Sequence, residues 1–322
     1  MKALFWLLLL SLAACIVGLM VGAVSLSPAT IVRALASPEA PAAAIVRDIR
    51  VPRILLAFLV GGALGVSGAA LQALVRNPLA DPYLLGISGG AGLAAVLAMA
   101  LGVSGAWGVP LVAFLGGLVA VGLVYRLSTV AGSRLDPRVL VLAGVIVSAF
   151  TGAVMTAVLT LSNAEQLRNA FLWLLGGFAS ASWRTVTVFA VYAVLPLLLL
   201  FGAARALDLL SLGEEPAESL GLEALRARRL VYLATSLLTA VSVAVCGVVG
   251  FVGLIAPHAL RGVLGPAHRR LLPAVFLASG GFLVLADALA RTVARPIELP
   301  VGVITALVGV PLFAMLLKRS LR

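Results

Sequence analysis

Long apolar runs, separated by short polar connections, follow one another along the whole chain. A helix needs about 20 mainly apolar residues to cross the hydrocarbon core of a bilayer. Nine runs approach this length: 4–26, 54–75, 84–103, 107–125, 139–161, 186–204, 229–249, 271–290 and 302–317. Two shorter apolar runs remain, at 169–183 and 251–264. The pattern predicts an all-α, polytopic membrane protein.

The charges at the two termini predict on which side of the membrane each terminus lies. Basic residues concentrate in cytoplasmic segments of membrane proteins. The N-terminus carries Lys2, and the C-terminus carries Lys318, Arg319 and Arg322. Both termini are therefore expected in the cytoplasm, which requires an even number of crossings.

Two internal basic groups decide how the shorter runs are placed. The groups at 226–229 and 269–270 should both be cytoplasmic, so 229–249 crosses outward and 251–264 returns. The run 169–183 then stays on the outer side as a re-entrant or interfacial piece. We expect ten transmembrane helices in one domain over residues 1–322, with fifteen basic side chains inside and eight outside.

The first run resembles a lipoprotein signal, because a basic start and an apolar core lead to Leu-Ala-Ala-Cys at Cys15. Signal cores span about 7–15 residues, whereas this apolar run continues to Leu26. We therefore interpret it as the first membrane helix.

Composition supports lipid as the solvent for this chain. Hydrophobic residues make up 62% of the 322 residues and charged residues only 11%, against about 25% charged in soluble domains. The net charge of +11 comes from arginines scattered between apolar runs, which form no basic face for nucleic acid. Cys15 and Cys246 both lie inside apolar runs, which argues against a disulfide or a metal site.

The segment LLSLGEEPAESLGLE, residues 209–223, concentrates four of the chain's twelve acidic residues in a predicted cytoplasmic loop. Pro216 suits the first turn of a helix, Glu214 and Glu215 suit a helix N-terminus, and Gly221 suits the left-handed position after a helix end. These signals predict a short helix, capped at both ends. It is either a solvated loop or, as we favour, a docking surface for a cytoplasmic partner.

Several arginines lie on the expected outer side, against the charge rule. They include the stretch RDIRVPR at 47–53, and Arg291. One interpretation is that they extend toward lipid headgroups. The other is that their planar guanidinium groups bind carboxylates of a soluble partner.

The sequence lacks the groups that would let this chain act alone. A Walker A loop requires Gly-Lys-Ser/Thr, but the only lysines are Lys2 and Lys318. Asp287 lies near a helix end and Glu298 in a loop, so neither forms the mid-helix proton relay of an ion-coupled carrier. We expect neither an enzyme nor a metal site.

Five stretches together resemble one family of membrane proteins. They are VPR (51–53), GGALGVSGAALQALVRNPLADPYLLGISGGAG (61–92), LGEEPAESLGL (212–222), GFVGLIAPHALR (250–261) and ADALARTVARPIELPVGVITALVGVP (286–311). In this order they are similar to FecCD-type permeases, the membrane subunits of ABC importers for iron–siderophore complexes, haem and cobalamin.

The resemblance implies partners and a location. It implies a homodimer of permease subunits, two separate ABC ATPases on the cytoplasmic side, and an extracytoplasmic substrate-binding protein. ATP and Mg²⁺ would bind the ATPase, with no cofactor on this chain. The location would be a bacterial or archaeal cytoplasmic membrane. Iron chelates, either siderophore or haem, are the expected cargo and cobalamin the alternative; a secondary transporter is the less favoured class.

The resemblance also implies roles for individual residues. The ATPase-coupling helix would comprise Leu212, Gly213, Glu214, Glu215, Ala217, Leu220 and Gly221. Binding-protein docking would use Arg50, Arg53 and Arg291.

The large cargo and the homodimer that the resemblance implies would place the pathway at the dimer axis, with 139–161 and the last helix lining it. Four residues of the former share one helical face and are candidates for the lining: Ser148, Thr151, Met155 and Ser162. Asp136 and Pro137 are candidates for a cytoplasmic gate.

Overall fold

The computed structural model describes residues 2–22, 24–103, 106–130 and 135–320, and every regular element in these ranges is helical. In chain order the elements are α1 (Lys2–Met20), α2 (Pro28–Ala36), the π-helix η1 (Ile45–Arg50), α3 (Val51–Val75), the 3₁₀ helix η2 (Pro82–Leu85), α4 (Ile87–Ala100), α5 (Gly108–Val130), α6 (Pro137–Leu161), α7 (Ala164–Leu174), α8 (Trp183–Gly202), α9 (Ala204–Leu212), α10 (Glu214–Ser219), α11 (Ala224–Cys246), α12 (Val252–Leu264), α13 (His268–Ala290) and α14 (Val301–Ser320).

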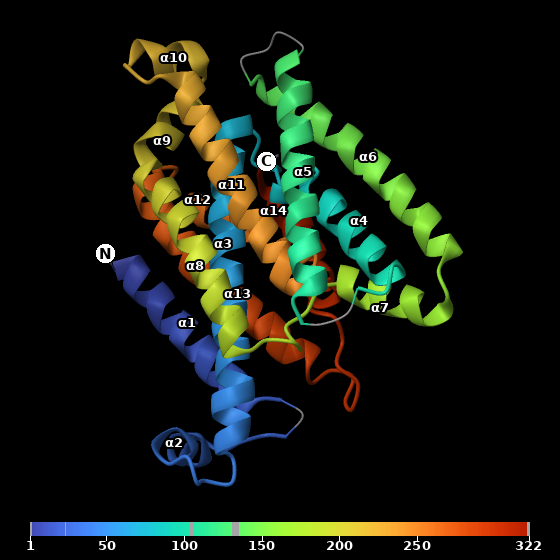
Figure 1. Cartoon of the computed structure of the whole chain (residues 1–322). Coiled ribbons are helices and arrows are strands. Elements are labelled where there is room, and N and C mark those ends of the chain that lie inside the picture. The colour runs from blue at the N-terminus through green and yellow to red at the C-terminus, as the bar shows by residue number, and fades with distance from the viewer. Residues whose placement is uncertain (1, 23, 104–105, 131–134, 321–322) are drawn as a thin grey trace.

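The long helices run between two ends of the molecule (Figure 1). One end carries α10 and is called here the α10 end; the other carries α2 and is called the α2 end. Seven helices of the described chain are long and apolar enough to cross a membrane: α1, η1 continued by α3, α5, α6, α8, α11 and α13. The segments Ile87–Ala100, Val252–Leu264 and Val301–Met315 are shorter apolar helices.

Each predicted crossing corresponds to one of these apolar helices. The described residues nevertheless contain fourteen α-helices rather than ten. The additional ones, α2, α7, α9 and α10, have at most 11 residues. They lie at or beyond the ends of the apolar runs, where the hydrophobic pattern carries little signal. The run 169–183, expected to stay on one side, contributes to α7 and the turn after it.

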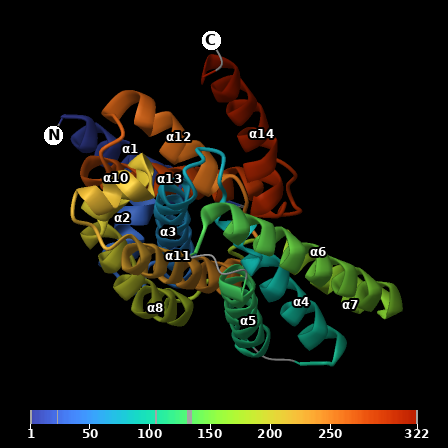
Figure 2. The same cartoon turned by 90° about the horizontal axis from the view of Figure 1, so that it is seen from above.

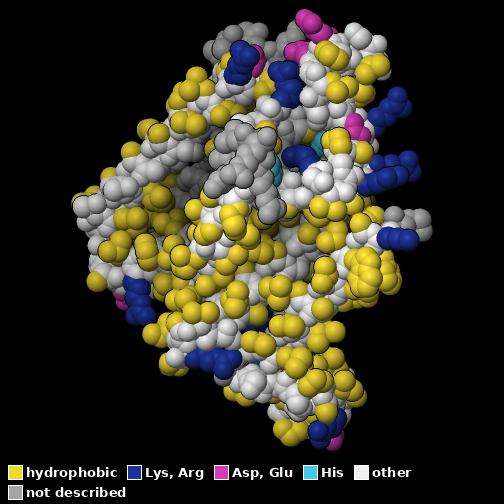
Figure 3. All heavy atoms as spheres, turned by 180° about the vertical axis from the view of Figure 1, so that it is seen from behind, with side chains coloured by type: hydrophobic (Ala, Val, Ile, Leu, Met, Phe, Trp, Pro, Cys, Tyr) yellow, Lys and Arg dark blue, Asp and Glu magenta, His cyan; other side chains and the backbone are white. Residues whose placement is uncertain are grey.

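The surface is apolar over most of the face shown in Figure 3, with Lys and Arg more frequent toward the α10 end. Exposed apolar side chains are numerous, among them Leu142, Phe150 and Leu307. A soluble protein rarely exposes so much contiguous apolar surface, so a lipid environment accounts for it. Of the basic residues used to place the C-terminus, Arg322 lies outside the described residues, and the side chains of Lys318 and Arg319 are likewise outside the description.

Helix α3 is the centre of the packing. Twenty of its 25 residues are buried, and it contacts α8, α9, α11, α12 and α13. Figure 2, viewed along the bundle, shows α3 enclosed by these helices. The stretch GGALGVSGAALQ at 61–72 makes this possible, because small residues let helix backbones approach closely in lipid.

Two of its glycines show how close the approach is. A Cβ atom added at Gly68 would lie 2.0 Å from the carbonyl oxygen of Gly253 on α12. One added at Gly65 would lie 2.1 Å from the hydroxyl of Ser279 on α13. Both interfaces therefore depend on the absence of a side chain.

Replacing Gly68 with Ala should force α3 and α12 apart and cost about 1–3 kcal/mol, as for other overpacked cores. The matched control is Gly122→Ala on α5, where nothing lies within 4 Å of the added Cβ. Thermal unfolding of the detergent-solubilised protein should show a lower Tm for Gly68→Ala only. Equal Tm values for the two variants would contradict the packing described.

Candidate functional site

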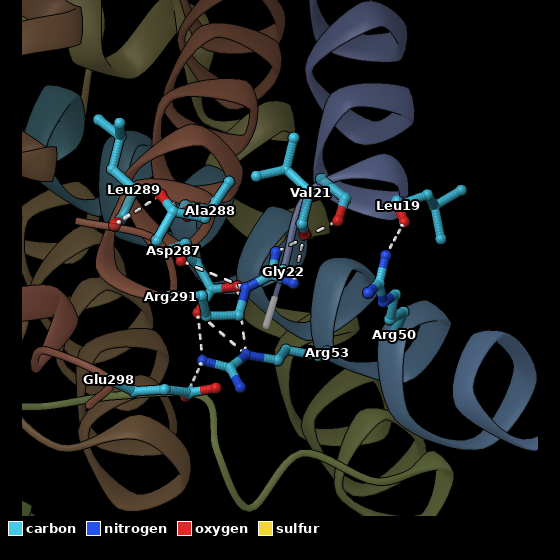
Figure 4. Close-up of polar contacts among 12 residues, drawn as sticks. Leu19, Val21, Gly22, Arg50, Arg53, Asp287, Ala288, Leu289, Arg291 and Glu298 are labelled. Atoms are coloured by element: carbon cyan, nitrogen blue, oxygen red, sulfur yellow. Dashed lines mark hydrogen bonds and ion pairs between the residues drawn. The ribbon is translucent and has the colours of Figure 1, made fainter. Parts of the chain in front are cut away.

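A cluster of five charged side chains, all buried except that of Glu298, lies at the α2 end, where α1, α3 and α13 meet (Figure 4). We call it the buried charge cluster and define it by Arg50, Arg53, Asp287, Arg291 and Glu298. Arg53 Nε lies 3.1 and 3.2 Å from the two carboxylate oxygens of Asp287, and Arg53 Nη2 lies 2.9 Å from Asp287 Oδ1. The same Nη2 donates to Glu298 Oε2 at 2.9 Å. Two carboxylates thus share one guanidinium.

Arg291 binds the other side of the Asp287 carboxylate. Its Nε is 3.0 Å from Asp287 Oδ2, an ion pair one helical turn apart. Its Nη1 donates to the carbonyl oxygen of Val21 at 2.9 Å and its Nη2 to that of Gly18 at 3.3 Å. Arg291 therefore connects α13 to the C-terminal end of α1.

Arg50 donates to the carbonyl oxygens of Leu19 and Val24, also at that end of α1. The last carbonyl groups of a helix have no partner within it, and cations there also interact favourably with the helix dipole. Arg50 and Arg291 satisfy two of these groups, the carbonyls of Leu19 and Gly18, and bind two more just after α1, at Val24 and Val21, which stabilises this end of the helix.

The structure thus gives Arg50, Arg53 and Arg291 internal partners. They are only 5%, 8% and 4% exposed, whereas the sequence placed them on the outer side beside helix ends. Their docking role stays a prediction. Sequence reasoning missed Asp287 and Glu298 as their partners; the available signal was an aspartate in an otherwise apolar helix, a position that is costly unless paired.

Arg53 and Glu298 also lie in the wall of a pocket of about 360 Å³. Its other walls include the turn Gly176, Gly177, Phe178 and the side chain of Trp173. Arg53 and Glu298 are therefore the members of the cluster that border open space.

A second candidate site lies at the α10 end and comprises residues 212–222, here called the acidic knob. Helix α10 begins at Glu214, with Glu214 and Glu215 in its first turn, as the sequence predicts. Gly213 has φ +116° and Gly221 φ +82°, conformations that favour glycine.

Backbone hydrogen bonds close the C-terminal end of α10. The amide of Gly221 donates to the carbonyl of Glu218 at 2.9 Å, and that of Leu222 to the carbonyl of Ala217 at 3.0 Å. This pair of bonds is a Schellman motif, so the predicted cap at Gly221 is confirmed.

Side-chain contacts fix the acidic knob to the bundle. Glu214 forms an ion pair of 2.9 Å with the buried guanidinium of Arg228 on α11, and Ala217 is fully buried. The other side of the knob faces solvent: Leu212 is 60% exposed and Leu220 58%, and Glu215 and Glu218 are exposed as well. The knob presents apolar and acidic groups together.

The helix before the knob is attached to α13. Asp208 on α9 accepts from the backbone amide of His268 at 2.8 Å, and the same oxygen lies 2.7 Å from His268 Nδ1. Since His268 begins α13 and Asp287 and Arg291 lie at its other end, α13 connects the two candidate sites.

Three of the four predicted lining residues, Ser148, Thr151 and Met155, lie on α6, and Ser162 is its C-cap. Thr151 is buried and donates to the carbonyl of Val147 at 2.8 Å, close to Gly89 of α4. Ser148, Met155 and Ser162 are partly buried on the same face. Their lining role stays a prediction.

Asp136 and Pro137, the gate candidates, occupy the first positions of α6. Asp136 is the N-cap and accepts from the amide of Arg138 at 2.8 Å. The geometry accounts for a helix start, and a gating role stays a prediction.

Comparison with known proteins identifies the family. The family model described as the FecCD transport family matches residues 8–319. The chain belongs to this family. The cobalamin import permease BtuC of Halobacterium salinarum is 43% identical over 274 residues, covering 85% of this chain and 73% of BtuC. The hemin transport permease HmuU of Yersinia pestis is 41% identical over 279 residues, covering 85% and 83%.

A solved structure agrees with this assignment. A protein described as a metal-chelate type ABC transporter, in an inward-facing conformation, superposes with a TM-score of 0.88 at 32% identity and covers 99% of both chains. The FecCD chain described here is thus a multi-pass permease of the ABC transporter class.

Neutralising Asp287 should destabilise this FecCD chain strongly. Asp287→Asn leaves Arg53 and Arg291 without their buried counter-charge, and breaking such a pair costs about 3–5 kcal/mol. The control is Glu223→Gln, which removes a pair with Arg226 whose side chains are 67% and 80% exposed and is worth at most about 1 kcal/mol. Thermal unfolding in detergent compares the two, and a Tm loss no larger for Asp287→Asn would show that the cluster contributes little to stability.

Proposed function

We propose that this chain is the membrane-spanning permease subunit of a binding-protein-dependent ABC importer for iron chelates, either siderophore or haem. The observation that carries the proposal is the acidic knob: a short, rigid, solvent-facing helix in a FecCD-family chain whose sequence contains no Walker A motif. Such a chain requires force from a separate ATPase, and the knob is a surface suited to receive it.

The proposed topology has ten crossings in one permease domain over residues 1–322. The seven long and three shorter apolar helices would all cross, placing both termini and the α10 end in the cytoplasm. The greater frequency of Lys and Arg toward that end supports this orientation. The α2 end would then face outward.

At the cytoplasmic side, an ABC ATPase would bind Leu212, Leu220 and the two exposed glutamates of the knob. Two ATPase subunits would serve a homodimer of this permease. ATP and Mg²⁺ would bind there, and this chain would bind no cofactor and catalyse no reaction.

The second permease copy would cover exposed apolar faces. Helix α6 exposes Leu142, Ile146 and Phe150, and α14 exposes Leu307 and Val310. Helix α14 packs mainly against α12 and α13, its first residues bond to the turn at 175–176, and it projects from the bundle in Figure 2. The cargo pathway would form between the two copies, with Asp136 and Pro137 at its inner gate and the predicted α6 face beside it.

At the outer side, a loaded binding protein would dock with its carboxylates toward Arg50, Arg53 and Arg291. ATP binding would then move the knobs, and hydrolysis would reset the permease. The mechanism requires a rigid connection between the two ends, which the attachment of α13 to both sites supports.

Relatives named for hemin and for cobalamin transport are 41% and 43% identical to this chain. These values do not separate the two, so a cobalamin importer of the same family is the alternative. A secondary transporter, which needs no ATPase, is disfavoured by the family and by the knob.

Reversing the exposed charges of the knob should uncouple the permease from its ATPase. We expect Glu215→Lys combined with Glu218→Lys to reduce ATPase co-purification and ligand uptake by about tenfold or more, since like-charge contacts at an interface cost several kcal/mol. Co-expression, affinity purification of the permease and uptake into cells measure both effects.

The matched control is Glu165→Lys in the exposed first turn of α7, which makes the same kind of charge reversal far from the knob. It should retain the ATPase. Retention of the ATPase by the knob variant, or uphill accumulation of cargo by the purified chain alone in vesicles, would contradict the proposed function.

A further inference from the structure

Glu298 differs from the other carboxylate of the buried charge cluster in its access to solvent. The Asp287 side chain is 1% exposed and that of Glu298 is 40% exposed. Asp287 is held by Arg53 and by Arg291, while the described contacts of Glu298 in the cluster are with Arg53 alone. Glu298 is therefore the carboxylate that can leave with the smaller loss of contacts.

The space beside this pair is already open. Arg53 and Glu298 both line the pocket of about 360 Å³. A carboxylate entering that pocket from solvent would meet Arg53 Nη2 at the position where Glu298 Oε2 now lies, 2.9 Å away. Entry and departure would occur on the same side of the guanidinium.

The charge balance of the cluster favours an additional anion. Arg53 and Arg291 pair with the carboxylates of Asp287 and Glu298, and the buried guanidinium of Arg50 adds a third positive charge beside them. Arg50 has backbone carbonyls as its acceptors. Burying a charge is costly unless it is paired, so a cluster with surplus positive charge suits an acidic partner.

We propose that Glu298 is an internal substitute for an acidic side chain of the docking partner. It occupies Arg53 in the free permease and is displaced when a carboxylate of the binding protein enters the pocket. The inference rests on the docking role proposed above for Arg53. It adds that the permease regulates docking through a competing carboxylate of its own.

Displacement of Glu298 would reach the cargo pathway through α14. Glu298 lies three residues before α14, and the junction is held by two hydrogen bonds to the turn at 175–176. The amide of Val301 donates to the carbonyl of Gly176 at 3.0 Å, and that of Gly302 to the carbonyl of Leu175 at 3.1 Å. Release of Glu298 would remove the side-chain contact that holds this junction. Docking would therefore loosen the start of α14.

Competition lowers the apparent affinity for the partner in proportion to the time that Arg53 is occupied. Removing the competing charge should therefore strengthen docking. A purely structural Glu298, which only holds the loop in place, predicts the opposite or no change. Whether the affinity for the binding protein rises therefore distinguishes a competing Glu298 from one that only holds the loop.

The test uses the permease reconstituted in lipid nanodiscs and the binding protein recovered when the assembled transporter is purified. Binding to wild type and to Glu298→Gln is measured by biolayer interferometry. Glu298→Gln should bind about 2- to 5-fold more tightly, the range expected when a partly exposed ion pair no longer competes. Glu298→Asp keeps the charge on a shorter side chain and should give a smaller gain.

Glu165→Gln is the control for net charge, since it removes one negative charge from an exposed side chain toward the same end of the molecule. It should bind as wild type does. If Glu298→Gln proves unstable in thermal unfolding, the test rests on Glu298→Asp. The proposal then requires Glu298→Asp to bind the binding protein more tightly than Glu165→Gln does.

Each remaining outcome overturns either the competition by Glu298 or the proposed docking itself. Normal docking to wild type with no gain in either Glu298 variant overturns the competition and leaves the proposed function standing. Equal gains in Glu298→Gln and Glu165→Gln assign the effect to net charge and also overturn the competition. Failure of wild type to bind any binding protein overturns the proposed docking, and this inference with it.

Discussion

The carboxylate of Asp287 holds one end of this molecule together. It lies in a region of low dielectric constant, where an unpaired charge is far more costly than in water. Both of its oxygens are used, because Arg53 binds from α3 and Arg291 from the end of α13. The two arginines are positioned in turn by other acceptors: Glu298 for Arg53, and the last carbonyls of α1 for Arg291. Three helices are thereby fixed by one buried anion.

Helix α13 connects the buried charge cluster at one end of the molecule to the region of the acidic knob at the other. It has 23 residues and so spans roughly 34 Å at 1.5 Å per residue. At its beginning His268 is bound to Asp208 of α9, next to the acidic knob. Between the two ends it packs against α3 so closely that Gly61 and Gly65 leave no room for a Cβ beside Ser279. Packed side chains and rigid helices of this kind can carry energetic coupling between distant sites.

The helices and the cap at Gly221 were predictable from the sequence. The long-range ion pairs were not, for a physical reason. Apolar length alone located every long helix, because lipid requires the same number of residues for each crossing. The cap at Gly221 was also predictable, since the left-handed conformation is a property of the residue itself. The ion pair between Arg53 and Asp287 was not, because these residues are separated by 234 positions and no local pattern encodes their contact. The same holds for Asp208 and His268, 60 positions apart, and so the attachment of α9 to α13 emerges only in three dimensions.

The contacts of the acidic knob explain how the coupling element proposed above can be so short. A helix of six residues is far below the length at which isolated helices are stable in water. Its order must come from elsewhere: the two glycines that turn the chain at either end, the buried Ala217, and the ion pair between Glu214 and Arg228. Ala217 and Glu214 point toward the bundle, which leaves Leu212, Glu215 and Leu220 exposed on the opposite side. A flexible loop presenting the same side chains would absorb a displacement through its own dihedral angles. A segment fixed by two glycine turns and two contacts with the bundle would pass the displacement on to the helices that hold it.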